Sequence, residues 1–135
     1  MSAYYNDIMN EDFSGKNIIS IEDNGGAQST YVKMLEQLGF HIDVAQDGEQ
    51  GLQMVKQKYY DIILLDIMMP KLNGIALVQK LNEEGVKYGK IIILSNLNNT
   101  ELADLMKKEN KIDEYLIKAE HRPEEVGEIV RRNLD

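Results

Sequence analysis

Short apolar runs rich in isoleucine recur along the chain from about residue 16 onward. Three of them, at 18–21, 62–65 and 91–94, are almost continuously hydrophobic. A run of this kind is typical of a strand that is covered on both faces, as in a parallel sheet. The run at 40–44 alternates apolar and polar residues, as a strand nearer an edge does, and 115–117 is a fifth, shorter run. The pattern predicts five strands.

Amphipathic stretches lie between these runs, with apolar residues three and four positions apart, and they predict helices. Two of them cover 28–38 and 73–81, and another begins at Asp47, an expected N-cap. A fourth begins with the polar residues 98–100, and the last begins at Pro123, which suits a first helical position.

Strands that alternate with helices predict an α/β fold, with a parallel sheet and helices on both of its faces. Five such strands suggest the doubly wound, flavodoxin-like order 2-1-3-4-5. We expect one domain over residues 16–135. Residues 1–15 show no clean period and are rich in turn-forming and charged residues, so we expect an N-terminal tail there.

Composition narrows the possible functions. The 135 residues contain no cysteine and only two histidines, which excludes disulfide scaffolds, zinc–thiolate sites, iron–sulfur clusters and thiol nucleophiles. A net charge of −8 repels nucleic acid, so we expect no nucleic-acid partner for this chain alone. No apolar run is long enough to span a membrane, and the N-terminus does not resemble a secretory signal. We therefore expect a cytoplasmic protein.

Candidate chemistry lies where the predicted strands end, because sites in such sheets form at the carboxyl edge. Glu22 and Asp23 follow the first strand, Asp66 the third, Ser95 the fourth and Lys118 the fifth. The first and third strands are neighbours in the predicted order, so we expect the three carboxylates to converge. Three such groups require compensation, for which Mg²⁺ is suited because it prefers oxygen ligands.

A carboxylate cluster with Mg²⁺, a lysine and a hydroxyl fits phosphoryl transfer to an aspartate. Asp66 is the best nucleophile because it ends a central strand, and Glu22 and Asp23 are better suited as metal ligands. Each residue alone has an ordinary explanation, such as a turn, a helix cap or a surface charge. The combination of Asp66 with Ser95, Lys118 and the acidic pair, each at the correct strand end, favours a functional site.

The motifs resemble the receiver domain of bacterial two-component response regulators, which is a CheY-like (βα)5 domain. The resemblance is carried by 19–24 (ISIEDN), 62–74 (IILLDIMMPKLNG), 93–95 (ILS) and 115–118 (YLIK). It extends from about residue 16 to the end of the chain, and the stretch from Asp66 to Gly74 is its most specific part.

The resemblance implies a phosphoacceptor with a bound metal. Asp66 would accept phosphate from a histidine of a sensor histidine kinase or a phosphotransfer protein. Mg²⁺ would be held by Glu22, Asp23, Asp66 and the backbone carbonyl of Met68. The domain would then be a signalling switch rather than an enzyme, since it catalyses at most its own phosphorylation and dephosphorylation.

The same resemblance implies how the switch operates. Lys118 and Ser95 would contact the phosphoryl group, and Tyr115 would turn inward as Ser95 moves toward it. The face formed by the fourth helix, the fifth strand and the last helix would then bind a downstream protein. The domain would be a monomer or a phosphorylation-dependent dimer.

Three features depart from the family's usual pattern. Ala119 follows Lys118 where a proline in a cis bond is usual, so we expect no cis proline there. Asn96 follows Ser95 where a smaller residue is usual, and it could partly cover the phosphorylation pocket. Residues 110–114 replace the usual Gly-Ala entry into the last strand. These differences affect the expected rates and loop shape.

Three alternatives remain open at this point. A degenerate receiver would act only as an interaction module. A flavodoxin-like electron carrier would use Gly25, Gly26, Ser29 and Thr30 to hold a flavin phosphate, but the neighbouring acids would repel it. A haloacid-dehalogenase-like phosphatase would need a second aspartate two positions after Asp66, where this chain has methionine.

Overall fold

A computed structural model of the chain describes residues 11–23, 29–69, 71–109 and 111–135. Most of the expected tail, and the Gly25–Gly26 pair of the electron-carrier alternative, lie outside the described residues. No helix within the described ranges combines the length and the apolar character needed to cross a membrane.

Five parallel strands form one sheet of order β2-β1-β3-β4-β5, which confirms the predicted fold. The alternating run, expected nearer an edge, forms the edge strand β2, and the shorter fifth run forms the other edge strand, β5. The strands are β1 (Ile18–Ile21), β2 (Ile42–Ala45), β3 (Ile62–Leu65), β4 (Lys90–Ser95) and β5 (Glu114–Ile117).

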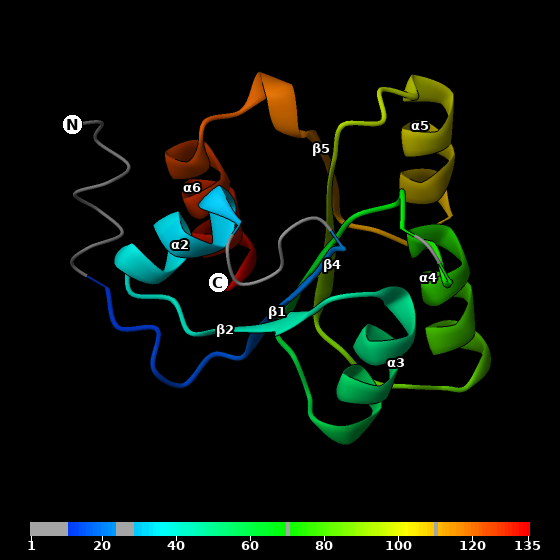
Figure 1. Cartoon of the computed structure of the whole chain (residues 1–135), viewed down its shortest axis with the longest axis horizontal. Coiled ribbons are helices and arrows are strands. Elements are labelled where there is room, and N and C mark those ends of the chain that lie inside the picture. The colour runs from blue at the N-terminus through cyan, green and yellow to red at the C-terminus, as the bar shows by residue number, and fades with distance from the viewer. Residues whose placement is uncertain (1–10, 24–28, 70, 110) are drawn as a thin grey trace.

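Helices cover both faces of this sheet (Figure 1). Two of them, α2 and α6, lie on one face, and α3, α4 and α5 lie on the other. A short 3-10 turn, η2 (Lys118–Glu120), precedes α6. The helices are α2 (Thr30–Gln37), α3 (Gly48–Gln57), α4 (Gly74–Glu83), α5 (Thr100–Lys108) and α6 (Pro123–Asn133).

The helix boundaries follow from local capping chemistry. The side chains of Asp47, Asn73 and Asn99 each accept a hydrogen bond from a backbone N–H three residues on, at 2.8, 2.9 and 3.0 Å. Pro123 is the first residue of α6. Gly39 ends the α2 segment with a φ of 102°, a conformation that favours glycine.

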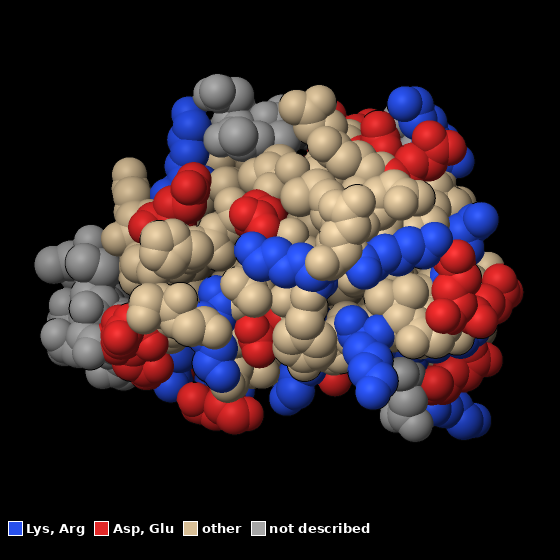
Figure 2. Space-filling model, turned by 90° about the horizontal axis from the view of Figure 1, so that it is seen from below, with Lys and Arg blue, Asp and Glu red and all other residues tan. Residues whose placement is uncertain are grey.

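Acidic and basic side chains are interspersed on the face seen in Figure 2. Exposed ion pairs on the surface include Lys58 with Asp43 at 3.1 Å and Lys56 with Glu84 at 2.7 Å. Exposed pairs of this kind contribute little to stability. The fold therefore depends mainly on its core.

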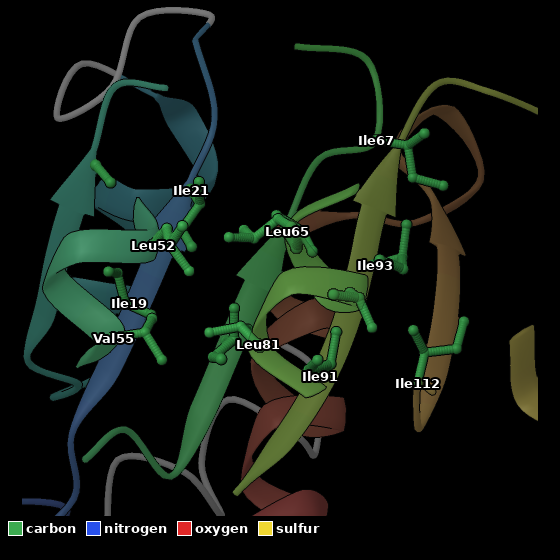
Figure 3. Close-up of a cluster of buried hydrophobic side chains, with 14 of the residues drawn as sticks. Ile19, Ile21, Leu52, Val55, Leu65, Ile67, Leu81, Ile91, Ile93 and Ile112 are labelled. Atoms are coloured by element: carbon green, nitrogen blue, oxygen red, sulfur yellow. The ribbon is translucent and has the colours of Figure 1, made fainter. Parts of the chain in front are cut away.

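Two apolar clusters, one on each face of the sheet, form that core. Ile19 (Figure 3) points into the cluster beneath α3, α4 and α5, and Ile63 belongs to the same cluster. Their neighbours Ile18 and Ile62 point into the opposite cluster, beneath α2 and α6. Because the side chains of a strand alternate between faces, a central strand must be apolar at every position, which explains the continuous runs in the sequence.

The described end of the expected tail packs onto the domain. The Phe13 side chain is only 4% exposed and stacks on Phe40, with ring centroids 4.2 Å apart. The Glu11 carboxylate lies 3.2 Å from the Arg131 guanidinium on α6. The division into a tail and a domain at residue 16 stays a prediction, but Phe13 itself is part of the core.

Candidate functional site

Five of the predicted site residues lie at the carboxyl edge of the sheet. Glu22 and Asp23 directly follow β1, Asp66 follows β3, Ser95 is the last residue of β4, and Lys118 follows β5. Since β3 lies between β1 and β4, Asp66 stands at the centre of this edge. This is where the strand order of such a sheet places a ligand site.

Lys118 joins two of the carboxylates. Its ammonium nitrogen donates to Glu22 Oε2 at 2.9 Å and lies 3.8 Å from Asp66 Oδ2. The three side chains are largely buried, with exposed fractions of 13% for Lys118, 8% for Glu22 and 11% for Asp66. One positive charge therefore faces two negative charges in a poorly hydrated position.

The Asp66 carboxylate is held by two donors on its other oxygen. The Ser95 hydroxyl donates to Asp66 Oδ1 at 2.7 Å, and the Met68 backbone N–H donates to the same oxygen at 3.1 Å. Ser95 is only 1% exposed, so its hydroxyl is shielded from water. These contacts present Asp66 in a defined orientation beside Lys118.

Hydrogen bonds continue from Ser95 to Tyr115. The Leu97 N–H donates to Ser95 Oγ at 3.3 Å, and the Tyr115 hydroxyl donates to the Leu97 carbonyl at 2.7 Å. Tyr115 is partly buried, and burial together with the Asp66 charge raises the pKa of its hydroxyl. The hydroxyl stays protonated at neutral pH, so it remains a donor in a chain of contacts that links Asp66 to β5.

The turn after Asp66 depends on a close backbone approach. The Gly74 N–H donates to the Ile67 carbonyl at 3.1 Å, which closes the loop onto the start of α4. A Cβ at Gly74 would lie 2.6 Å from the Asp66 carbonyl oxygen. Only glycine fits this approach, which explains the glycine at the end of the most specific motif.

Asp23 does not join the other two carboxylates in this arrangement. Its side chain is exposed, whereas Glu22 is buried. Across the described ranges, no three Asp, Glu or His side chains are grouped so that they could hold a metal ion. The four-ligand Mg²⁺ set therefore stays a prediction.

Sequence reasoning did not identify Tyr31 as a site residue, but the structure gives it a polar contact near Lys118. Its hydroxyl, on α2, donates to the Lys118 carbonyl at 2.7 Å and lies 3.1 Å from the His121 carbonyl. Tyr31 also lines a small pocket together with Glu22 and Asp66. No sequence pattern pairs residues that lie 87 positions apart.

Comparison with known proteins identifies the family. The response regulator receiver domain family matches residues 18–131, so the chain belongs to that family. It is 34% identical over 101 residues to the transcriptional regulatory protein CpxR of Escherichia coli K12. That match covers 75% of this chain and 42% of CpxR. The chain spans less than half the length of the curated relatives it matches.

Solved structures agree on the fold. The receiver domain of the Francisella response regulator 1452 superposes with a TM-score of 0.77 at 28% identity, over 88% of this chain and 96% of that one. TrrA of Thermotoga maritima, a response regulator protein solved in complex with Mg²⁺ and BeF, gives 0.69 at 26% identity, over 88% and 99%. The chain is thus a receiver domain of the two-component type, a signalling module with the CheY-like α/β fold.

Proposed function

We propose that this receiver domain accepts a phosphoryl group on Asp66 and acts as a phosphorylation switch. The observation that carries the proposal is the arrangement around Asp66, with Lys118 at 3.8 Å from one carboxylate oxygen and the Ser95 hydroxyl at 2.7 Å from the other. A positive charge and a hydroxyl donor are the groups that stabilise charge on a transferring phosphoryl group.

Two buried carboxylates near Lys118 offer the oxygen donors that Mg²⁺ prefers. Glu22 and Asp66 are buried carboxylates that share the single positive charge of Lys118. The three groups together therefore retain a net negative charge. Asp23, next in the chain and exposed at the same edge, is available as a third carboxylate. Glu22, Asp23, Asp66 and the Met68 carbonyl would hold Mg²⁺, which would supply positive charge to neutralise the carboxylates and the phosphoryl oxygens.

The chain's own residues perform the transfer. An Asp66 carboxylate oxygen attacks the phosphorus of a phosphohistidine on a sensor histidine kinase or a phosphotransfer protein. The new O–P bond forms as the N–P bond breaks, and the electron pair of that bond returns to the imidazole nitrogen. Lys118 and Ser95 hold the phosphoryl oxygens, so catalysis is mainly positioning and charge stabilisation.

The response follows the contacts that leave Ser95. When Ser95 bonds to a phosphoryl oxygen, Leu97 moves with it. The Tyr115 hydroxyl, which donates to the Leu97 carbonyl, follows. The face formed by α5, β5 and α6 then changes shape and binds a downstream protein. The receiver domain itself is a monomer or a phosphorylation-dependent dimer. Phosphorylation must favour one conformation by several kcal/mol to act as a clean switch.

Incubation with Mg²⁺ and acetyl phosphate, followed by intact-mass measurement, tests the phosphoacceptor. We expect one phosphoryl adduct that is stable in acid and labile in base. The adduct should be absent from Asp66→Asn, which keeps the size of the side chain but lacks the nucleophilic carboxylate.

A wild-type protein that forms no adduct under these conditions would favour the degenerate receiver, an interaction module without phosphorylation. An adduct that persists in Asp66→Asn would mean that another residue is the acceptor.

A further inference from the structure

Lys118 lies just beyond the part of the chain that the sheet holds. The paired register of β5 ends with Ile117 opposite Ser95, and Lys118 begins the three-residue turn η2. This turn has no side-chain cap, and its closing hydrogen bond, from the His121 N–H to the Lys118 carbonyl, is long at 3.4 Å. The backbone that carries the ammonium therefore needs support from elsewhere.

Tyr31, on α2, provides that support. Its hydroxyl lies 2.7 Å from the Lys118 carbonyl and 3.1 Å from the His121 carbonyl, so one donor holds both ends of the turn. The Tyr31 ring packs against the cluster that α2 shares with α6. The hydroxyl is thus carried by α2, which packs against α6.

The chemistry of the Tyr31 hydroxyl suits a permanent donor. Burial raises the pKa of this phenol, against a smaller opposing effect of the nearby Lys118 charge. The O–H is therefore retained at neutral pH, and two carbonyl oxygens are available to accept its single proton. The bond to Lys118 is the shorter one.

We propose that Tyr31 is a positioning residue for phosphoryl transfer, which acts by fixing the Lys118 turn so that the ammonium reaches Asp66. This inference rests on the proposed function. Placement matters at this position because a small displacement of a group that stabilises transferring charge lowers the rate steeply. Tyr31 acts through Lys118 and does not itself contact the phosphoryl group.

Tyr31→Phe removes only the hydroxyl oxygen and is the main test. We expect its phosphorylation by acetyl phosphate to slow by about three- to tenfold, the size expected for one lost hydrogen bond. The rate is measured at a temperature well below the thermal unfolding midpoint. A loss of stability alone then leaves the protein folded and the rate unchanged.

Tyr60→Phe is the matched control. The Tyr60 hydroxyl also makes a 2.7 Å hydrogen bond, to Asp43 Oδ2, but Tyr60 lies before the start of β3, at the opposite edge of the sheet. We expect this variant to lose stability and to keep the wild-type phosphorylation rate. Equal slowing in both tyrosine variants would overturn the proposal, as would a wild-type rate in Tyr31→Phe.

A double-mutant cycle tests whether Tyr31 acts through Lys118. In a Lys118→Ala background, where the residual rate no longer depends on the ammonium, Tyr31→Phe should slow the reaction no further. An undiminished effect of Tyr31→Phe in that background would contradict the proposed route.

Hydrogen exchange separates this proposal from the phosphoacceptor proposal, because it needs no phosphorylation. In the unphosphorylated protein, Tyr31→Phe should speed amide exchange across residues 118–122, and Tyr60→Phe should not. If the wild type forms no adduct, the proposed function fails. Unchanged amide exchange in Tyr31→Phe refutes the support of the turn, whether or not an adduct forms.

Discussion

Lys118 shows how much a single residue contributes to this site. Its ammonium contacts Glu22 and lies within 4 Å of Asp66, and all three side chains are largely buried. Removing one member of a buried charge pair leaves an uncompensated charge, which costs more than the pair itself contributes. The residue that is expected to stabilise the phosphoryl group therefore also stabilises the resting fold.

Lys118→Met should lower the free energy of unfolding at neutral pH by about 3 kcal/mol, because two buried carboxylates lose their shared counterion. Urea unfolding measures this loss. Lys58→Met is the matched control, since the Lys58–Asp43 pair is 49% and 43% exposed. An exposed pair of this kind is worth less than about 1 kcal/mol. Equal losses in the two variants would contradict the assigned role of Lys118.

Residue types at strand ends could be predicted from the sequence, but their contacts could not. Strand order alone was sufficient to predict that the residues at these strand ends lie at one edge of the sheet, namely Glu22, Asp66, Ser95 and Lys118. The choice of Glu22 as the main partner of Lys118, and the contact from Tyr31, depend on side-chain reach across the sheet. No periodicity encodes that reach.

The junction between β3 and α4 is a tightly packed element boundary near the site. It carries Asp66 at one end and Gly74 at the other, with their backbones in close approach. A side chain at Gly74 would push against the peptide that orients the acceptor carboxylate. This element therefore couples the helix start to the position of Asp66.

Gly74→Ala should destabilise the protein by about 1–3 kcal/mol, the usual cost of overpacking, and should also slow phosphorylation of Asp66. Thermal unfolding and the acetyl phosphate rate measure the two effects. Gly15→Ala is the control, because a Cβ there would have no neighbour within 4 Å. A Gly74→Ala protein with wild-type stability and rate would refute the close approach.

Helix starts were predictable because capping is local. Asp47, Asn73 and Asn99 act within three residues of themselves, so their identity in the sequence is sufficient. The turn η2 was not predicted, because its contact with Tyr31 joins residues far apart in the sequence. No cis peptide bond occurs among the described residues.

The folded molecule includes at least one residue of the expected N-terminal tail. Phe13 lies in the same apolar cluster as Phe40 and the buried face of α6. The sequence could not reveal this, because a single aromatic residue among turn formers has no period. The alternating strands and helices, by contrast, repeat five times and predicted the whole sheet.

Phe13→Ala should lower the free energy of unfolding by about 3 kcal/mol, since it removes a stacked ring from the core. Tyr59→Ala is the control, because Tyr59 is an aromatic residue that is 51% exposed. Urea unfolding of the two variants decides the boundary. If both lose the same small amount, the folded unit begins at residue 16, as the sequence suggests.

Chemical trapping of the acyl phosphate tests the phosphoacceptor most directly. Borohydride reduces an aspartyl phosphate to homoserine, which peptide mass spectrometry then locates in the chain. After treatment with Mg²⁺ and acetyl phosphate, we predict homoserine at position 66 and at no other acidic residue. Homoserine at a different position, or none at position 66 under these conditions, would contradict the account of this receiver domain as a switch driven through Asp66.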